Sequence, residues 1–186
     1  MIYTLIPPTD PRVLSSIAPF EEKKLKEDDK ISTKEFSDNM FETMTKYGGI
    51  GLSANQVGKP YRMFVMGDHP SIEKGKKWTC YNPEIRGHSK ETIRFKEGCL
   101  TFPYLFLDIE RPRAVAVTYY DENMKKVEEN LTGMPARIFQ HEFDHMNGVV
   151  MTEKVSKFKL EMAMKKRDKQ IKRLLKLQKQ QENKNG

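Results

Sequence analysis

Apolar side chains recur every three or four residues in the segment 33–47, at Phe36, Met40, Met44 and Tyr47. This period places them on one face of an amphipathic α-helix. A pair of glycines follows directly, and glycine commonly ends a helix. We therefore predict a helix over 33–47. The preceding residues 7–35 mix proline, charge and scattered apolar positions, and we expect an extended arm and loop there.

Five segments are rich in β-branched and aromatic residues, a composition that favours strands. They are residues 61–67, 79–85, 92–96, 114–121 and 125–131. Asp121, Glu122 and Asn123 lie between the last two segments and have the composition of a hairpin turn.

Two further helices are predicted in the last third of the chain. Pro135 suits the first turn of a helix and Gly148 its C-terminal end. A second apolar stripe recurs at helical spacing from residue 157 onward, at Leu160, Met164, Ile171, Leu174 and Leu175. Residues 178–186 are expected to be frayed or disordered. The fold class is then α+β: a mostly antiparallel sheet packed around a central helix at 135–148, with a further C-terminal helix.

The length of 186 residues favours one domain with a substantial core. The mean hydropathy is −0.72, and no run of about 18 apolar residues exists that could span a membrane. The N-terminus lacks the basic and apolar regions of a secretion signal. Two cysteines are too few for a disulfide framework. We expect a cytoplasmic protein with free thiols and no membrane partner.

Positive charge is concentrated at the C-terminal end. Residues 154–186 hold twelve lysines and arginines against three acidic residues, a formal charge of +9, so the remainder carries −2 of the total +7. We expect a near-neutral domain over 1–153 and a basic helix and tail over 154–186, part of the same domain or an appendage. Such a helix is either a solvated surface or a docking segment for a polyanion.

One motif carries chemistry by itself: HEFDH, residues 141–145. On a helix, His141 and His145 lie one turn apart on one face, where two imidazoles can bind one metal ion. Glu142 can then reach a water on that metal.

A catalytic metal site usually has a third protein ligand. The extended zinc-peptidase pattern fails because Met151 stands at its last histidine, and a downstream glutamate, Glu153 or Glu161, lies in no recognisable context.

Cys99 is the better candidate for the third ligand. It follows a predicted strand, beside a glycine and just before a turn, in the segment EGCLTFP. Its thiolate would give a Cys-His-His site suited to zinc or ferrous iron. The alternative for a lone cysteine is burial as a small hydrophobe, which we expect for Cys80.

The glycine-rich segment GGIGLSANQVG, residues 48–58, is a third element of interest. It does not follow a strand and open a helix, so a dinucleotide-binding loop is excluded. Glycines let the backbone approach a ligand closely, and the Gln56 amide can donate to a carbonyl oxygen.

The segments GIGLSANQ, EGCL and QHEFDH, in this order and at these separations, resemble the three signature motifs of peptide deformylase. The resemblance spans most of the domain and implies a metal-dependent hydrolase that removes the N-formyl group from the formylmethionine of nascent polypeptides and releases formate. It implies three metal ligands, Cys99, His141 and His145. It further implies that metal-bound water attacks the formyl carbon, with Glu142 as general base and acid.

The same resemblance assigns the remaining site. Gln56 and the backbone N–H of Leu100 match the groups that polarise the formyl oxygen, and Gly51 lines the substrate cleft. Glu97 holds the motif structurally. The methionine side chain is expected against Ile50, Met134 and Ile138. The resemblance implies one divalent metal ion per chain, Fe²⁺ in the cell, with Zn²⁺, Ni²⁺ or Co²⁺ also able to occupy the site.

Two positions depart from the family pattern. Ser53 stands where alanine is common and Thr101 where serine is common, and neither is expected to touch a catalytic atom. In some family members a C-terminal helix docks on the ribosome, so the basic segment 154–179 is expected to recruit the enzyme there through ribosomal RNA. The alternatives are a metallopeptidase that cleaves internal bonds and a non-catalytic RNA-binding module.

Overall fold

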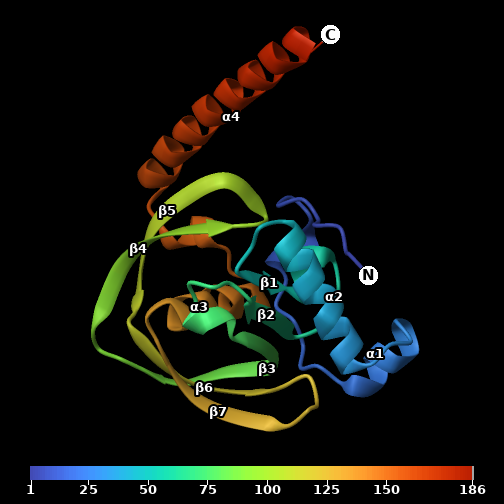
Figure 1. The fold of residues 1–186 in the computed structure, drawn as a ribbon. Helices are drawn as coiled ribbons and strands as arrows, with labels where there is room; N and C mark the ends of the chain where they lie inside the picture. The colour runs from blue at the N-terminus through green and yellow to red at the C-terminus, as the bar shows by residue number, and fades with distance from the viewer. Residues whose placement is uncertain (186) are drawn as a thin grey trace.

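The computed structural model describes residues 1–185 of the chain and the side chains of residues 1–181 (Figure 1). The helices are α1 (Glu22–Asp28), α2 (Thr33–Lys46), α3 (Gly133–Met146) and α4 (Lys157–Asn185). Short 3-10 turns are η1 (Pro11–Leu14), η2 (Ala54–Val57), η3 (Glu73–Gly75) and η4 (Met151–Lys154). The strands are β1 (Gly51–Ser53), β2 (Met63–Gly67), β3 (Lys77–His88), β4 (Thr92–Cys99), β5 (Phe102–Pro112), β6 (Ala114–Tyr120) and β7 (Lys126–Thr132).

The strands form two antiparallel units. Five of them pair in the order β1-β2-β3-β6-β7, and β4 and β5 form a separate hairpin. The predicted turn joins β6 to β7, where the Asp121 carboxylate accepts hydrogen bonds from the backbone N–H groups of Asn123 and Lys125, both at 2.9 Å. The predicted α+β class is confirmed: Figure 1 shows α3 lying between the five-stranded sheet and the hairpin.

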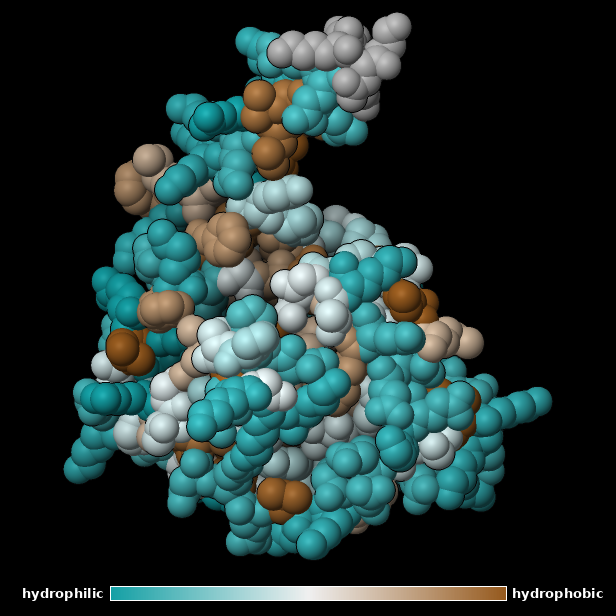
Figure 2. Space-filling view, in the orientation of Figure 1, coloured by the Kyte–Doolittle hydropathy of each residue, from teal (hydrophilic) through white to brown (hydrophobic). Residues whose placement is uncertain are grey.

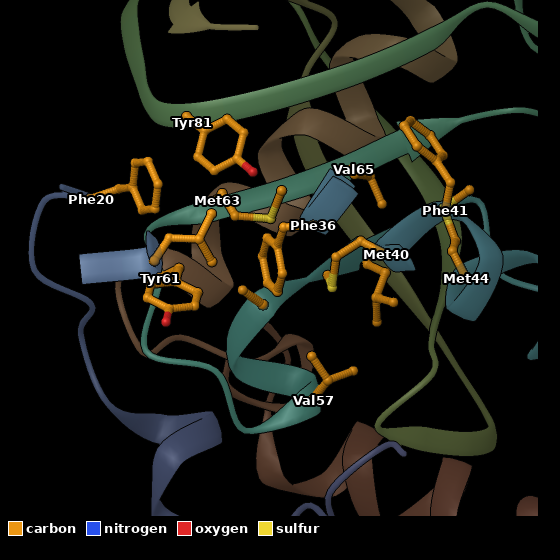
Figure 3. Packing of buried hydrophobic residues seen from close by; sticks show 13 residues of the cluster. Phe20, Phe36, Met40, Phe41, Met44, Val57, Tyr61, Met63, Val65 and Tyr81 are labelled. Carbon is orange, nitrogen blue, oxygen red and sulfur yellow. The ribbon is translucent and has the colours of Figure 1, made fainter. Parts of the chain in front are cut away.

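Strand β2 is buried on both faces, and its alternation divides the core in two. Met63 and Val65 pack into a cluster with α2, part of which Figure 3 shows. Phe64 and Met66 point to the opposite face and pack with α3. The ring of Phe64 meets that of Phe139 edge to face at 5.1 Å. A strand with both faces covered reads as a continuous apolar run, and all five residues of β2 are buried.

The hairpin strand β5 was not predicted. Its alternate residues Leu105, Leu107 and Ile109 are buried against Met151 and the first turns of α4. The intervening Tyr104 and Phe106 are apolar but exposed, at 50% and 53%. Because the exposed positions 104 and 106 are aromatic, the alternation of buried apolar and exposed polar residues is clear in the sequence only over residues 107–110.

Two other expectations were wrong at the ends of the chain. The segment 7–35 is not all extended, since it contains η1 and α1, and α1 is anchored by the fully buried Leu25. Residues 178–185 continue α4 instead of fraying, while Gly186 lies outside the described residues. The end of α4 is rich in lysine, glutamine and glutamate, which favour the helix without tertiary packing. No helix in residues 1–185 is both long and apolar enough to cross a membrane.

Candidate metal centre and its cleft

Helix α3 places the two motif histidines in the interior. Ten of its fourteen residues are buried, because it contacts β1, β2, β6 and β7 as well as the hairpin. His141 and His145 lie one turn apart, with ring centroids 5.1 Å from each other. The helix begins at Gly133, whose φ is +59°, and Gly148, with φ +73°, follows its C-cap residue Asn147.

Cys99 meets the histidines from the hairpin. It is the last residue of β4, where the β4–β5 register shifts between Gly98 and Cys99. Its Sγ lies 3.3 Å from Nε2 of His145, and the ligand atoms of Cys99, His141 and His145 all fall within 4.8 Å of one another. Among the described side chains, those of residues 1–181, no other His, Cys, Asp or Glu group forms such a cluster. Glu153 and Glu161 are exposed and take no part in it.

The donor set fits a divalent metal. Burial alone would raise the pKa of the Cys99 thiol, but electrostatic attraction from His145 and hydrogen bonds from His141 and His145 hold that pKa well below its ordinary value. A thiolate and two imidazoles are the donors that zinc and ferrous iron accept. Cys80 differs: it is fully buried in β3, and burial raises the pKa of its thiol. The expectation that Cys80 is a packing residue agrees with this position.

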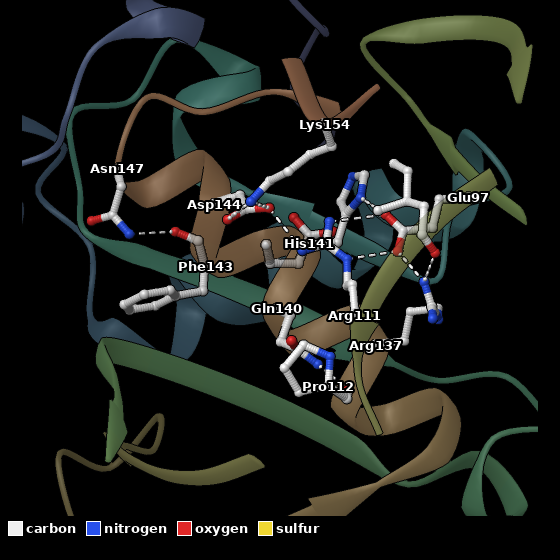
Figure 4. Close-up of polar contacts among 12 residues, drawn as sticks. Glu97, Arg111, Pro112, Arg137, Gln140, His141, Phe143, Asp144, Asn147 and Lys154 are labelled. Atoms are coloured by element: carbon white, nitrogen blue, oxygen red, sulfur yellow. Dashed lines mark hydrogen bonds and ion pairs between the residues drawn. The ribbon is translucent and has the colours of Figure 1, made fainter. Parts of the chain in front are cut away.

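Glu97 orients His141 through a hydrogen bond to its Nδ1 (Figure 4). Its Oε2 accepts a hydrogen bond from Nδ1 of His141 at 3.0 Å, which leaves Nε2 to face the Cys99 side. Both Glu97 oxygens also accept from the Arg111 guanidinium, at 2.6 and 2.9 Å, and Arg137 donates at 2.6 Å. Burial would raise the pKa of Glu97, but the bonds from His141 and Arg111 lower it to about 2. The carboxylate is therefore charged and fixed, as in metal sites where a carboxylate holds the ligand histidine.

Arg111 links this cluster to the next turn of α3. Its Nη1 donates to Asp144 at 2.8 Å, and Asp144 also accepts from Lys154 of η4 at 3.1 Å. Arg111 was not predicted. It continues the alternation of Leu105, Leu107 and Ile109 on β5, so a correct strand assignment would have predicted that its side chain points into the protein interior. A buried arginine needs an acidic partner.

Glu142 follows His141 on α3 and contacts β1. Its Oε2 accepts a 2.6 Å hydrogen bond from the Ser53 hydroxyl. A Cβ on Gly51 would come within 2.3 Å of Glu142 Oε1, so only glycine fits there without displacing the carboxylate. Burial raises the pKa of Glu142 above its ordinary value. A carboxylate with a raised pKa is suited to accept and return a proton.

Gln56 is held in one orientation by three partners. Its Oε1 accepts from the Ser53 backbone N–H at 2.8 Å, and its Nε2 donates to Thr101 Oγ1 at 2.9 Å and approaches Cys99 Sγ at 3.4 Å. The expectation that Ser53 and Thr101 touch no catalytic atom was therefore wrong. Both carry a hydroxyl, and each hydroxyl bonds a residue that the motifs had singled out.

These groups open on one cleft of about 950 Å³, and Figure 2 shows hydrophobic residues in the hollow at the base of α4. The residues expected to bind substrate all line it: Ile50, Gly51, Gln56, Leu100, Met134 and Ile138. Its outer rim is aromatic, with Phe95, Tyr104 and Phe106 from the hairpin about half exposed. An apolar cleft with convergent polar groups at one end is typical of a substrate site.

The polypeptide deformylase family model matches residues 10–161, which hold the whole cluster. The chain belongs to the polypeptide deformylase family. A peptide deformylase of Thermotoga neapolitana is 47% identical over 120 residues, 63% of this chain and 69% of that protein. One of Rhodopseudomonas palustris is 36% identical over 175 residues, 88% of this chain and 98% of that protein.

Solved structures of the family have the same fold. The peptide deformylase of Legionella pneumophila superposes with a TM-score of 0.79 at 31% identity, covering 94% of this chain and 98% of its own. That of Synechococcus elongatus in complex with actinonin gives 0.78 at 30%, covering 89% and 86%. The chain is thus a metal-dependent hydrolase that removes the N-formyl group from formylated nascent peptides. The predicted endopeptidase and RNA-binding alternatives find no support in these matches.

Proposed function

We propose that Cys99, His141 and His145 hold the catalytic metal and that Glu142 transfers the proton. The observation that carries this proposal is the convergence of the three ligand atoms within 4.8 Å beside the buried Glu142 carboxylate. When bound, a divalent ion lowers the pKa of a coordinated water and polarises a carbonyl oxygen. Glu142 accepts the proton of the attacking water and passes it to the amine nitrogen as the C–N bond breaks.

The oxygen of the formyl group is received by two donors of this chain, the Gln56 amide and the backbone N–H of Leu100. The Gln56 amide is suited to this because Ser53 engages its oxygen and Thr101 accepts one Nε2 hydrogen, so the second N–H is directed toward Cys99 and the cleft. Losing one donor of this kind typically lowers kcat by about 10²–10³. Ile50, Met134 and Ile138 form the pocket for the methionine side chain, and Gly51 leaves room for the Glu142 carboxylate.

Ferrous iron is proposed as the metal in the cell, with Zn²⁺, Ni²⁺ or Co²⁺ as functional substitutes. Both thiols are free, and a thiolate ligand requires reducing conditions, which supports a cytoplasmic location. The test is formate release from formyl-Met-Ala-Ser under anaerobic conditions, with metal analysis of the same sample. Equal activity in a sample free of bound metal, or activity that survives air in an iron-loaded sample, would contradict the assignment.

One lysine-rich face of α4 is proposed to dock on ribosomal RNA. Lys165, Lys169, Lys172, Lys176 and Lys179 are exposed and recur at intervals of four and three, so they share one face of the helix. A row of lysines along a rigid helix suits a phosphate backbone. The first turns of α4 instead pack on β5, and Arg167 donates to the Pro103 carbonyl at 2.9 Å. We therefore assign residues up to about 171 to the catalytic domain and the rest to an appendage.

Replacing the five lysines by glutamine tests the docking without disturbing the packed turns. The matched control replaces five exposed lysines elsewhere, at positions 23, 24, 34, 46 and 90. We expect the α4 variant to lose co-sedimentation with ribosomes at low salt, the control to keep it, and both to hydrolyse formyl peptides normally. Equal co-sedimentation of the two variants would contradict the proposal.

A further inference from the structure

The hydroxyl of Ser53 makes a hydrogen bond to the Glu142 carboxylate. The serine closes β1 and is fully buried, and its hydroxyl donates to Glu142 Oε2 at 2.6 Å. In the part of the chain that the structure describes, no other group donates a hydrogen bond to that carboxylate. An alanine at this position could make no such bond.

The terminal torsion of a glutamate is soft, so burial alone does not fix the rotation of its carboxylate. Here one oxygen is bound by Ser53 and the other lies against the α-carbon of Gly51, where a Cβ would come within 2.3 Å of it. We propose that Ser53 is a positioning residue for the reaction: its hydroxyl locks the Glu142 carboxylate so that Oε1 faces the cleft. This inference rests on the proposed role of Glu142 as general base.

The backbone of Ser53 makes the position rigid enough for this task. Ser53 pairs with Phe64 in the β1–β2 ladder, and its N–H donates to Gln56 Oε1 at 2.8 Å. One residue therefore orients both Glu142 and Gln56. In the transfer itself the Ser53 proton stays on Oγ, while Glu142 Oε1 takes the proton of the attacking water and returns it to the departing nitrogen. Fixing a catalytic group in its reactive orientation acts on kcat rather than on substrate binding.

The test is S53A in the metal-loaded, full-length enzyme, assayed by formate release from formyl-Met-Ala-Ser. We expect kcat to fall about tenfold with KM unchanged, in line with the loss of one hydrogen bond to a charged group. Restoring the hydroxyl with S53T should recover most of the rate. The matched control is S37A, which removes another buried serine hydroxyl that donates to the Thr33 carbonyl in α2 at 2.7 Å. Its kcat should equal that of the wild type.

A kcat within twofold of wild type in S53A overturns the proposal, as does a raised KM at unchanged kcat. A loss of bound metal in S53A that accounts for the lower rate also overturns it. Should S53T fail to fold, S53A is compared in the wild-type and E142D backgrounds. E142D withdraws the carboxylate by one methylene, so S53A should cost nothing further there, and an equal tenfold loss in both backgrounds rejects the idea.

The proposed function and this inference fail differently. If E142A retains the wild-type rate, the general-base role is wrong and Ser53 has nothing to position. If E142A is inactive while S53A turns over normally, only the positioning role is wrong.

Discussion

Helices α3 and α4 are both rich in ionisable residues, but they use them in opposite ways. In α3 the ionisable groups are mostly buried and each has a partner: Arg137 and His141 bond Glu97, and Glu142 bonds Ser53. In α4 no side chain among residues 157–181 is buried, and beyond residue 171 all of them are exposed. Figure 1 shows the consequence, since α3 lies inside the fold and α4 projects from it.

The two helices differ in whether their charged side chains are held in a fixed arrangement or are free in solvent. Burying a charge without its partner raises the free energy of the folded state, so each charged side chain of α3 is held in its paired position. Exposed lysines on α4 contribute little to stability and are free to meet a partner. Substitutions in α3 should therefore alter chemistry, metal binding and stability together, whereas substitutions at the end of α4 should alter none of them.

The largest effect is expected for E142A. Removing the proposed general base should lower kcat by about 10²–10⁴. The fold and the bound metal should persist, because the three proposed ligands remain. Formate release and metal content of the same sample measure this. E153A, at an exposed glutamate of η4, is the control and should stay at the wild-type rate. A near-normal rate for E142A would show that Glu142 of α3 does not transfer the proton.

The next largest effect is expected for R111M. It removes the guanidinium that bonds both oxygens of Glu97 and also Asp144, and leaves the buried Glu97 and the partly exposed Asp144 short of donors. Breaking a buried pair in this way costs about 3–5 kcal/mol. Glu97 would then be held less firmly against the proposed ligand His141, and loss of such an outer partner typically weakens metal binding about 10–100-fold. Chemical denaturation and metal competition measure the two effects.

R113M is the matched control for R111M. Arg113 follows two residues later, but its partner Glu91 is exposed and the ion pair lies in solvent. The control should change stability by no more than about 0.5 kcal/mol. Equal losses in R111M and R113M would show that burial does not distinguish the two regions.

The sequence predicted helix α3 and the closeness of His141, His145 and Cys99 because that information is largely local. The spacing of His141 and His145 is set by the helix itself, and the motif at Cys99 lies beside a recognisable strand end. The cluster around Glu97 could not be derived in the same way. Its partners Arg111 and Arg137 lie 14 and 40 residues away, and only the β4–β5 pairing and the docking of α3 bring them together.

Ser53 illustrates the same limit at one position. Its contact with Glu142 joins residues 89 apart, and nothing in the local sequence distinguishes a serine that fills space from one that bonds a carboxylate. The missed strand β5 has a different cause. Aromatic residues at the exposed positions 104 and 106 leave only residues 107–110 with a clear alternation, which is the lower limit for a strand prediction, so neither the strand nor the inward direction of Arg111 was predicted.

A smaller effect is expected where α4 meets the domain. Leu160 packs against the Leu105, Leu107 and Ile109 cluster, while Leu175 is 54% exposed. L160A should lower stability by about 1–2 kcal/mol, less than for a fully buried leucine because Leu160 is only partly buried. L175A should change it by less than about 0.5 kcal/mol. Denaturation midpoints compare the two variants, and equal losses would mean that the end of α4 also packs on the domain.

The smallest effect is expected from deleting residues 174–186. The deletion keeps every α4 side chain that joins the β5 cluster, and also keeps the bond from Arg167 to Pro103. Peptide hydrolysis and the unfolding midpoint should therefore match the full-length protein. Deleting all of α4 should be different, because it would expose Leu105, Leu107 and Ile109 to water. If the short deletion lowers kcat on a free peptide, the end of α4 acts on the cleft, and the division between a catalytic interior and an independent basic surface is wrong.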